Sequence, residues 1–195
     1  MMVKLRFFIL ALLLSISLNA KFLINDHLIS PKAADMIEKM GSELKEKSGF
    51  NAYLITTNDK IDRGVSVYDF VKRYKSLEEP YIAIVFAPNS KRIHLISNPK
   101  DLKKKLDEDK ILDYAIKIIG SVDKNSKQSK YDVGLVQAYS EMADEIASLK
   151  GVKLNSTIKS GGNWVLSIIN TLIIIGSIIV IWFFFINPLI KKIKR

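Results

Sequence analysis

An uncharged apolar run near the C-terminus constrains this chain more than any other feature. Residues 164–186 read WVLSIINTLIIIGSIIVIWFFFI and contain no charged side chain. A bilayer core is about 30 Å thick, so a helix that rises about 1.5 Å per residue needs roughly 20 residues to cross it. A helix of a soluble protein does not need apolar residues on every face over such a length. The run therefore predicts a transmembrane helix.

The charges on either side of this run predict its orientation. Four basic residues follow it within nine positions, whereas Lys159 is the only cation in the ten positions before it. An excess of Lys and Arg marks the cytoplasmic side of a span. We therefore expect residues 187–195 to form a basic cytoplasmic tail and residues 21–163 to lie outside the cytoplasm. The residues that set this topology are Lys191, Lys192, Lys194 and Arg195.

The N-terminus has the layout of a secretory signal. Lys4 and Arg6 precede an apolar run over residues 7–18, and the small residue Ala20 follows. This run is too short to span a bilayer comfortably, so we predict a signal peptide over residues 1–20. An uncleaved anchor is the alternative, and it places the middle of the chain on the same side. The chain has no cysteine, which excludes disulfides, thiol catalysis and thiolate metal sites.

About 140 residues remain between these two segments, enough for one domain with a core of its own. The net charge of +10 overstates how basic this domain is, because residues 21–163 hold 24 basic and 20 acidic groups. Such a modest surplus suits solubility and gives no reason to expect a nucleic-acid partner.

Hydrophobic patterns predict alternating strands and helices over residues 21–150. Ser30 and Pro31 suit the start of a helix and Gly49 suits its end. The run of residues 81–87 is apolar throughout, as expected for a strand buried on both faces. Gly161 and Gly162 indicate that residues 151–163 form a linker. The predicted strands cover residues 22–24, 50–57, 81–87 and 92–97, and the predicted helices cover residues 31–48, 67–77, 100–122 and 131–149.

Several segments resemble the TPM domain, a small extracytoplasmic domain of bacterial envelope proteins. The resemblance covers residues from about 24 to 150 and follows the order and spacing of that family. The family architecture agrees with the patterns above and implies a three-layer α/β/α sandwich with a small mixed sheet, here with one C-terminal transmembrane helix. The similar segments are INDHLIS at 24–30, EKSG at 46–49, residues 67–74, residues 81–87 with Arg92 and Ile93, and YDVGL at 131–135.

The resemblance implies a membrane-anchored extracytoplasmic module that binds to or assists an envelope protein complex. We expect a single-pass protein of the bacterial inner membrane, with its domain in the periplasm or outside, the lipid bilayer and an envelope membrane protein as partners, and no nucleic acid. Some family members bind calcium or have weak phosphatase activity, so a divalent-metal-binding domain with weak phosphatase activity is the alternative. The chain departs from the family where residues 98–101 (NPKD) replace a glycine-rich acidic turn.

A polar loop after the first long strand carries the candidate metal ligands. Asp59 and Asp62 lie where open α/β sheets tend to place their ligands. Asn58 adds a third oxygen donor, and Asp26 is placed to add a fourth. Hard cations such as Ca²⁺ prefer several oxygen ligands, which makes calcium the candidate cofactor. The competing interpretation is a solvated turn whose Asp caps the next helix.

No catalytic residue is predicted. The chain contains two histidines, and His94 lies between two apolar residues of a predicted strand. This position favours a side chain on the sheet face or in solvent over a general base. The sequence contains no Gly-x-Ser-x-Gly motif, no metalloprotease motif and no phosphate-binding loop.

Three polar residues within the predicted span share one helix face. Ser167, Asn170 and Ser177 are separated by offsets of three and seven residues. Polar side chains within a bilayer hydrogen-bond to other spans, at about 0.6 to 2 kcal/mol each. We therefore expect this face to bind a partner helix. Small polar residues also occur in spans that have no partner, which is the competing interpretation.

Overall fold

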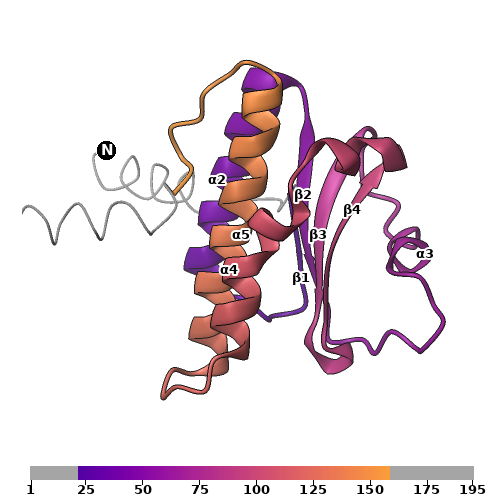
Figure 1. Ribbon diagram of the computed structural model, residues 1–195, viewed down its shortest axis with the longest axis vertical. Helices are drawn as coiled ribbons and strands as arrows, with labels where there is room; N and C mark the ends of the chain where they lie inside the picture. Colours follow the sequence, from indigo (N-terminus) through magenta and orange to yellow (C-terminus); the bar gives the residue numbers. More distant parts are fainter. Residues whose placement is uncertain (1–21, 159–195) are drawn as a thin grey trace, which may run out of the picture. The chain divides into compact units, whose positions relative to one another are not determined.

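The computed structural model describes residues 22–158, and its strands form one mixed four-stranded sheet (Figure 1). The strand order is β1-β2-β3-β4; β1, β2 and β3 are parallel, and β4 is antiparallel to β3. The predicted α/β fold with a small mixed sheet is therefore confirmed. The strands are β1 (Leu23–Asn25), β2 (Asn51–Thr56), β3 (Tyr81–Ala87) and β4 (Arg92–Asn98).

The helices are divided unequally between the two faces of the sheet. Figure 1 shows α2, α4 and α5 on one face and α3 on the other. The β1–β2 connection passes through α2 and the β2–β3 connection passes through α3. Both connections move one strand in the same direction along the sheet, but they run over opposite faces. These two crossovers therefore have opposite handedness. The helices are α2 (Pro31–Ser48), α3 (Val67–Val71), α4 (Glu108–Gly120) and α5 (Lys127–Leu149), with the 3-10 turns η1 (Pro88–Ser90) and η2 (Lys100–Lys105).

Helix α2 begins and ends where its sequence signals predict. The Ser30 hydroxyl accepts a hydrogen bond from the Ala33 N–H, and Pro31 is the first helical residue. Gly49 has φ of 71° and donates its N–H to the Lys45 carbonyl at 2.8 Å. Glycine adopts this left-handed conformation without the strain that a Cβ would cause. The local signals for this helix are thus sufficient to set both of its ends.

Three helices differ from the predicted ranges. The predicted helix over residues 100–122 is divided into η2 and α4, because the Asp107 carboxylate accepts a hydrogen bond from the Lys110 N–H and starts a new helix. Helix α3 ends at Val71 instead of residue 77, and the chain continues as turns in which Tyr74 and Leu77 still pack against the core. Their contact with the core explains why these two positions are apolar although the helix has already ended. Helix α5 begins four residues before the predicted start, because the Ser126 hydroxyl accepts a hydrogen bond from the Ser129 N–H.

The helical face contains a tightly fitted buried contact between α2, α5 and the residue before β1. A Cβ at Gly41 would lie 2.5 Å from the Phe22 ring and 2.5 Å from the Tyr139 hydroxyl. Tyr139 is fully buried and donates its hydroxyl proton to the Ala52 carbonyl at 2.8 Å. Burial raises the pKa of this phenol well above its ordinary value. The absence of a side chain at Gly41 is therefore what allows α2 to approach the Tyr139 hydroxyl and Phe22.

The opposite face of the sheet buries a second apolar cluster beneath α3, and Phe22 at the edge of the sheet belongs to both. Val67 and Val71 of α3 pack over alternate residues of β2 and β3, together with Ile61 from the preceding loop. Alternate residues of a strand point to the same face, which explains this selection. The strand and N-terminal members of the cluster are Phe22, Tyr53, Ile55, Tyr81, Ala83, Val85, Ala87 and Ile96.

Part of the predicted linker is packed onto α2. The Glu43 carboxylate accepts hydrogen bonds from the N–H groups of Asn155 and Ser156, both at 2.8 Å, and from the Ser156 hydroxyl. Leu154 is buried, and Lys47 donates to the Lys153 carbonyl at 2.8 Å. Ser156 is also the last residue of the compact unit that contains the sheet. Residues 151–156 thus belong with the domain.

The predicted membrane segments lie outside the described residues. Between residues 22 and 158, no helix is both long enough and apolar enough to cross a bilayer. The predicted signal peptide, the span at residues 164–186 and the basic tail all fall beyond this range.

Candidate functional site

Two of the four predicted metal ligands meet at the carboxyl edge of the parallel strands. Asp26 follows β1, and its Oδ2 accepts hydrogen bonds from the Thr57 hydroxyl at 2.8 Å and from the Asn58 N–H at 3.1 Å. The Asn58 side chain returns a bond of 2.8 Å to the Asp26 carbonyl. Asp26 and Asn58 therefore lie close together, as expected, and they are joined by two hydrogen bonds that Asn58 donates to Asp26.

The other two predicted ligands are engaged in different contacts. Asp59 Oδ2 accepts a bond of 2.6 Å from Arg73, whose guanidinium lies 3.7 Å from the centre of the Phe70 ring. Asp62 uses its carbonyl, which accepts from the Val65 N–H at 3.2 Å and from Arg92 at 3.4 Å. These contacts tie the β2–α3 loop to α3 and β4.

The predicted metal site lacks a compact group of acidic side chains. Among residues 22–158, no three acidic or histidine side chains lie close enough together to hold a metal ion. A cation at this edge would have to combine the Asp26 and Asp59 carboxylates with carbonyl and amide oxygens, and it would compete with Arg73 for Asp59. The hydrogen bonds of Asp26 and Asp59 hold the loop in place, and calcium binding remains a prediction.

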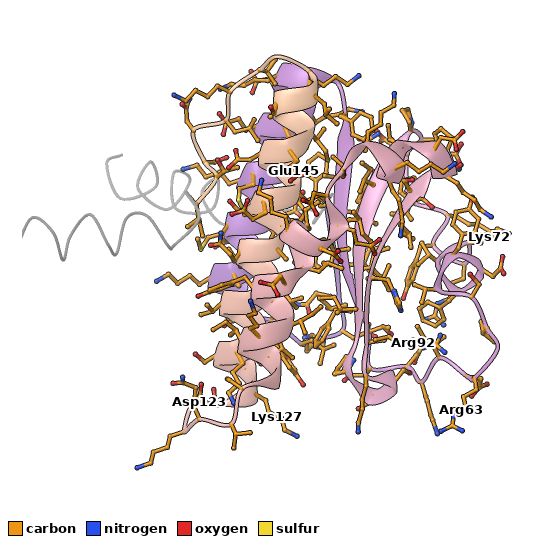
Figure 2. All side chains as sticks on the ribbon, in the orientation of Figure 1. Arg63, Lys72, Arg92, Asp123, Lys127 and Glu145 are labelled. Carbon is orange, nitrogen blue, oxygen red and sulfur yellow. The ribbon has the colours of Figure 1, made fainter. Side chains whose placement is uncertain are left out.

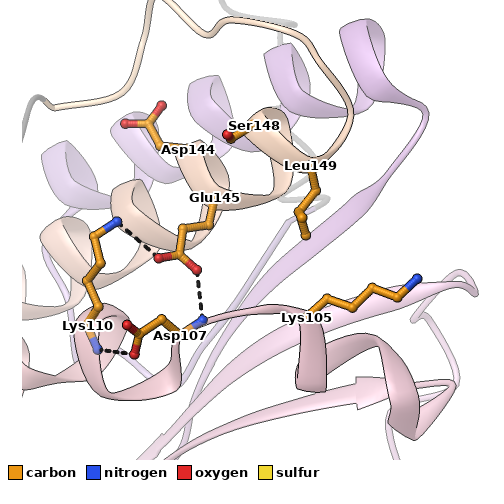
Figure 3. Close-up of a pocket in the computed structure, with 7 residues that line it drawn as sticks. All are labelled: Lys105, Asp107, Lys110, Asp144, Glu145, Ser148 and Leu149. Atoms are coloured by element: carbon orange, nitrogen blue, oxygen red, sulfur yellow. Dashed lines mark hydrogen bonds and ion pairs between the residues drawn. The ribbon is translucent and has the colours of Figure 1, made fainter.

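A hollow of about 390 Å³ lies between the start of α4 and the end of α5 (Figure 3). Glu145 accepts hydrogen bonds of 3.0 Å from the Asp107 N–H and from the Lys110 ammonium group. This hydrogen bond to Glu145 raises the pKa of Lys110. The charged groups at the centre of this hollow are thus paired with each other, which favours a structural role in joining the two helices.

A groove of about 310 Å³ lies on the other face, between the start of α3 and β4. Its apolar floor includes Val67 and Ile96, and Val65 at its rim is 43% exposed. The described residues that line it include three basic side chains and no acidic one. The basic residues are Arg92, His94 and Lys103.

The charges of this groove are held in place by main-chain contacts. Arg92 donates to the Val65 carbonyl at 3.0 Å, and Lys103 donates to the Leu95 carbonyl at 3.0 Å. Lys103 also pairs with Glu108 at 2.6 Å. Partial burial lowers the pKa of His94, so its imidazole is mostly uncharged at neutral pH. Arg92 and Lys103 are therefore the positive charges of the groove under ordinary conditions.

Two further lysines lie beside the groove. The ammonium groups of Lys100 and Lys72 lie 4.7 Å and 5.1 Å from the centre of the Tyr68 ring. Figure 2 shows Lys72 and Arg92, together with Arg63, on the α3 side of the sheet, whereas Glu145 lies on the helical side. The sequence did not reveal this site, because its residues come from three separate segments. The alternation of Arg92, His94 and Ile96 along one strand face was the available signal.

The remaining predicted site residues lie outside the described range. Ser167, Asn170 and Ser177 belong to the predicted span, and the four cations that predict its orientation, Lys191, Lys192, Lys194 and Arg195, follow it.

Comparison of the chain with family models gives no match, and a search of curated proteins finds no similar sequence. The resemblance to the TPM domain accordingly stays a prediction.

Proposed function

We propose that this chain is a membrane-anchored extracytoplasmic binding module, which assists an envelope protein complex of the bacterial inner membrane. The proposal includes a three-layer α/β/α sandwich of TPM type outside the cytoplasm, a single C-terminal transmembrane helix and a cytoplasmic tail. Its partners are the bilayer and a membrane protein of that complex.

The docking of residues 151–156 onto α2 is the observation that supports this proposal most directly. Glu43 holds two N–H groups and a hydroxyl of this segment, so the domain extends to within a few residues of the predicted span. Residues 157–163 are the only chain left between Ser156 and that span. Seven extended residues reach at most about 25 Å. Such a short tether raises the effective concentration of the domain for any partner at the membrane surface.

The charge of Glu43 favours a permanent attachment of residues 151–156 to α2. Burial by itself would raise the pKa of Glu43, but hydrogen bonds from Lys47, Ser156 and the Asn155 N–H lower it from 4.5 to about 2. The carboxylate therefore stays ionised, and keeps its hydrogen bonds, throughout the pH range of a bacterial envelope.

A crosslinked pull-down from membranes tests the module. The full-length chain is compared with the same chain whose residues 164–186 are replaced by an unrelated span. A partner lost on replacement supports recruitment through the span, and Asn170→Leu should then weaken that association as well. A partner retained after replacement places recognition on the domain. Recovery of no specific partner with either chain contradicts the proposed function.

Divalent-metal binding with weak phosphatase activity is the second candidate function. It is favoured by the meeting of Asp26 and Asn58 at the carboxyl edge of β1 and β2, next to Asp59. The purified full-length chain should then release phosphate from p-nitrophenyl phosphate only with calcium or another divalent ion, and Asp59→Ala should abolish release. An NMR titration without any response at millimolar calcium contradicts this function.

A further inference from the structure

We propose that the groove between the start of α3 and β4 binds an extended segment of a partner protein that carries acidic and apolar side chains. This inference rests on the proposed function of the chain as a binding module, and it names the surface and the chemistry of the partner.

The charge of the groove selects the sign of the partner. Arg92 and Lys103 line it, Lys72 and Lys100 flank its Tyr68, and no acidic side chain of the described residues forms its wall. Glu108 neutralises Lys103 in part, and Asp69 pairs with Lys72 at 2.7 Å. A net positive potential remains around Arg92 and Lys100. Complementary charge guides and orients a partner on such a surface, so an acidic segment fits it.

The hydrogen bonds of the basic groups favour a peptide over a small anion. Arg92 already donates to the carbonyls of Val65 and Asp62, and Lys103 already donates to the Leu95 carbonyl. Few donors are thus left to surround a small anion. The groove is also open and has an apolar floor, and its volume of about 310 Å³ is at the small end of ligand pockets. A peptide with apolar side chains between acidic ones would contact both the apolar floor and the basic groups of the groove.

The adjacent strand offers main-chain pairing for an extended segment. Strand β4 lies at the edge of the sheet. Leu95 turns its peptide groups to the outer side of β4, where Glu108 and Lys103 bind them at 3.2 Å and 3.0 Å. Because strands repeat every two residues, Ile93 presents its N–H and C=O on the same side. The Leu95 groups are occupied by these two side chains, so a segment that lies along the groove would pair with Ile93 by strand addition, a common mode of peptide recognition.

Fluorescence anisotropy with peptide probes tests this inference on the full-length chain in detergent micelles. The probe is a fluorescein-labelled octapeptide of alternating glutamate and valine. Matched probes alternate lysine with valine and glutamate with serine. We expect the glutamate–valine peptide to bind about tenfold more tightly than either control, and 0.5 M salt to weaken it, because both charge and apolar contact contribute.

Substitutions then locate the binding surface. Val65→Glu and His94→Glu each place a negative charge in the groove, and each should weaken the glutamate–valine peptide by about tenfold. Val133→Glu on α5 and Lys39→Glu on α2 are the matched controls on the other face, where Val133 is 48% exposed. These controls should change the affinity by less than about twofold. Far-UV circular dichroism checks that all four variants are folded.

Four results would overturn the inference: no binding of the glutamate–valine peptide at millimolar concentration, equal binding of the three peptides, unchanged affinity in both groove variants, or displacement of the peptide by inorganic phosphate or by anionic lipid added as mixed micelles. The pull-down separates this failure from that of the proposed function. A membrane partner that both groove variants retain would leave the module intact and exclude the groove. Absence of any specific partner for the unsubstituted chain would contradict the module itself.

Discussion

Three helices of 13 to 23 residues cover one face of the sheet, whereas the five-residue helix α3 and its flanking loops cover the other. On the helical face, α2 and α5 approach so closely that Gly41 lies against the Tyr139 hydroxyl. On the α3 face, surface contacts such as Arg73 with Asp59 hold the cover in place, and a groove remains open beside β4. The comparison suggests that stability depends mainly on the helical face, while the α3 face is available for binding. The four predictions below test this division, from the largest expected effect to the smallest.

Gly41→Ala should produce the largest loss of stability. Its Cβ would lie 2.5 Å from the Phe22 ring and from the Tyr139 hydroxyl, both fixed within the core. We expect the free energy of unfolding to fall by about 3 kcal/mol. Urea unfolding of the full-length chain in micelles, followed by far-UV circular dichroism, measures this change. Gly120→Ala is the control, because a Cβ there meets nothing within 4 Å. Equal effects of the two substitutions would contradict the close contact.

Tyr139→Phe should have the second largest effect. It removes the donor to the Ala52 carbonyl and leaves that acceptor buried without this bond. We expect a loss of about 2 kcal/mol in the same unfolding measurement. Tyr114→Phe on α4 provides the comparison, since Tyr114 is 42% exposed, and it should change stability by less than about 0.5 kcal/mol. Little loss in Tyr139→Phe would mean that packing alone secures this face.

Glu43→Gln should release residues 151–156 and remove a pH dependence. The pKa of Glu43 in the folded chain, about 2, is lower than its ordinary value of 4.5. Its contribution to stability is therefore complete above about pH 4.5 and is lost as the pH falls through about 2. We expect the substitution to cost about 1 kcal/mol at neutral pH and progressively less toward pH 2.

Hydrogen exchange at the Asn155 and Ser156 amides measures the release directly. Exchange should accelerate in Glu43→Gln and stay unchanged in Glu46→Gln, since Glu46 is an exposed residue of the same helix. Protection that persists in Glu43→Gln would show that Leu154 alone docks the segment.

Asp59→Asn should have the smallest effect on stability. Its ion pair with Arg73 lies at the surface, where the two side chains are 58% and 44% exposed. Water and salt screen such pairs, so we expect a loss of about 0.5 kcal/mol, which should decrease in 0.5 M salt. Asp62→Asn in the same loop serves as the control. A loss of more than about 2 kcal/mol would show that the α3 face also carries much of the stability, against the division proposed above.

Sequence patterns were reliable where a local signal was strong. Ser30, Pro31 and Gly49 set α2, and the apolar run of residues 81–87 predicted the buried strand β3. The pattern was ambiguous after Val71, because the apolar spacing of Tyr74 and Leu77 suits a helix and also suits turns that pack on a core. Of the four predicted metal ligands, Asp26 and Asn58 do meet, and the metal site itself stays a prediction. The groove was missed because its residues are distant in sequence.

The sequence by itself determined the alternation of strands and helices, the mixed α/β class and the prediction of a membrane span, because each depends on composition or short-range spacing. Only the tertiary structure decided which face of the sheet each helix covers, why a glycine is required within α2, and that residues 151–156 bind Glu43. These properties depend on contacts between residues far apart in the chain. Such contacts form when the helices pack on the sheet, and no local pattern encodes them.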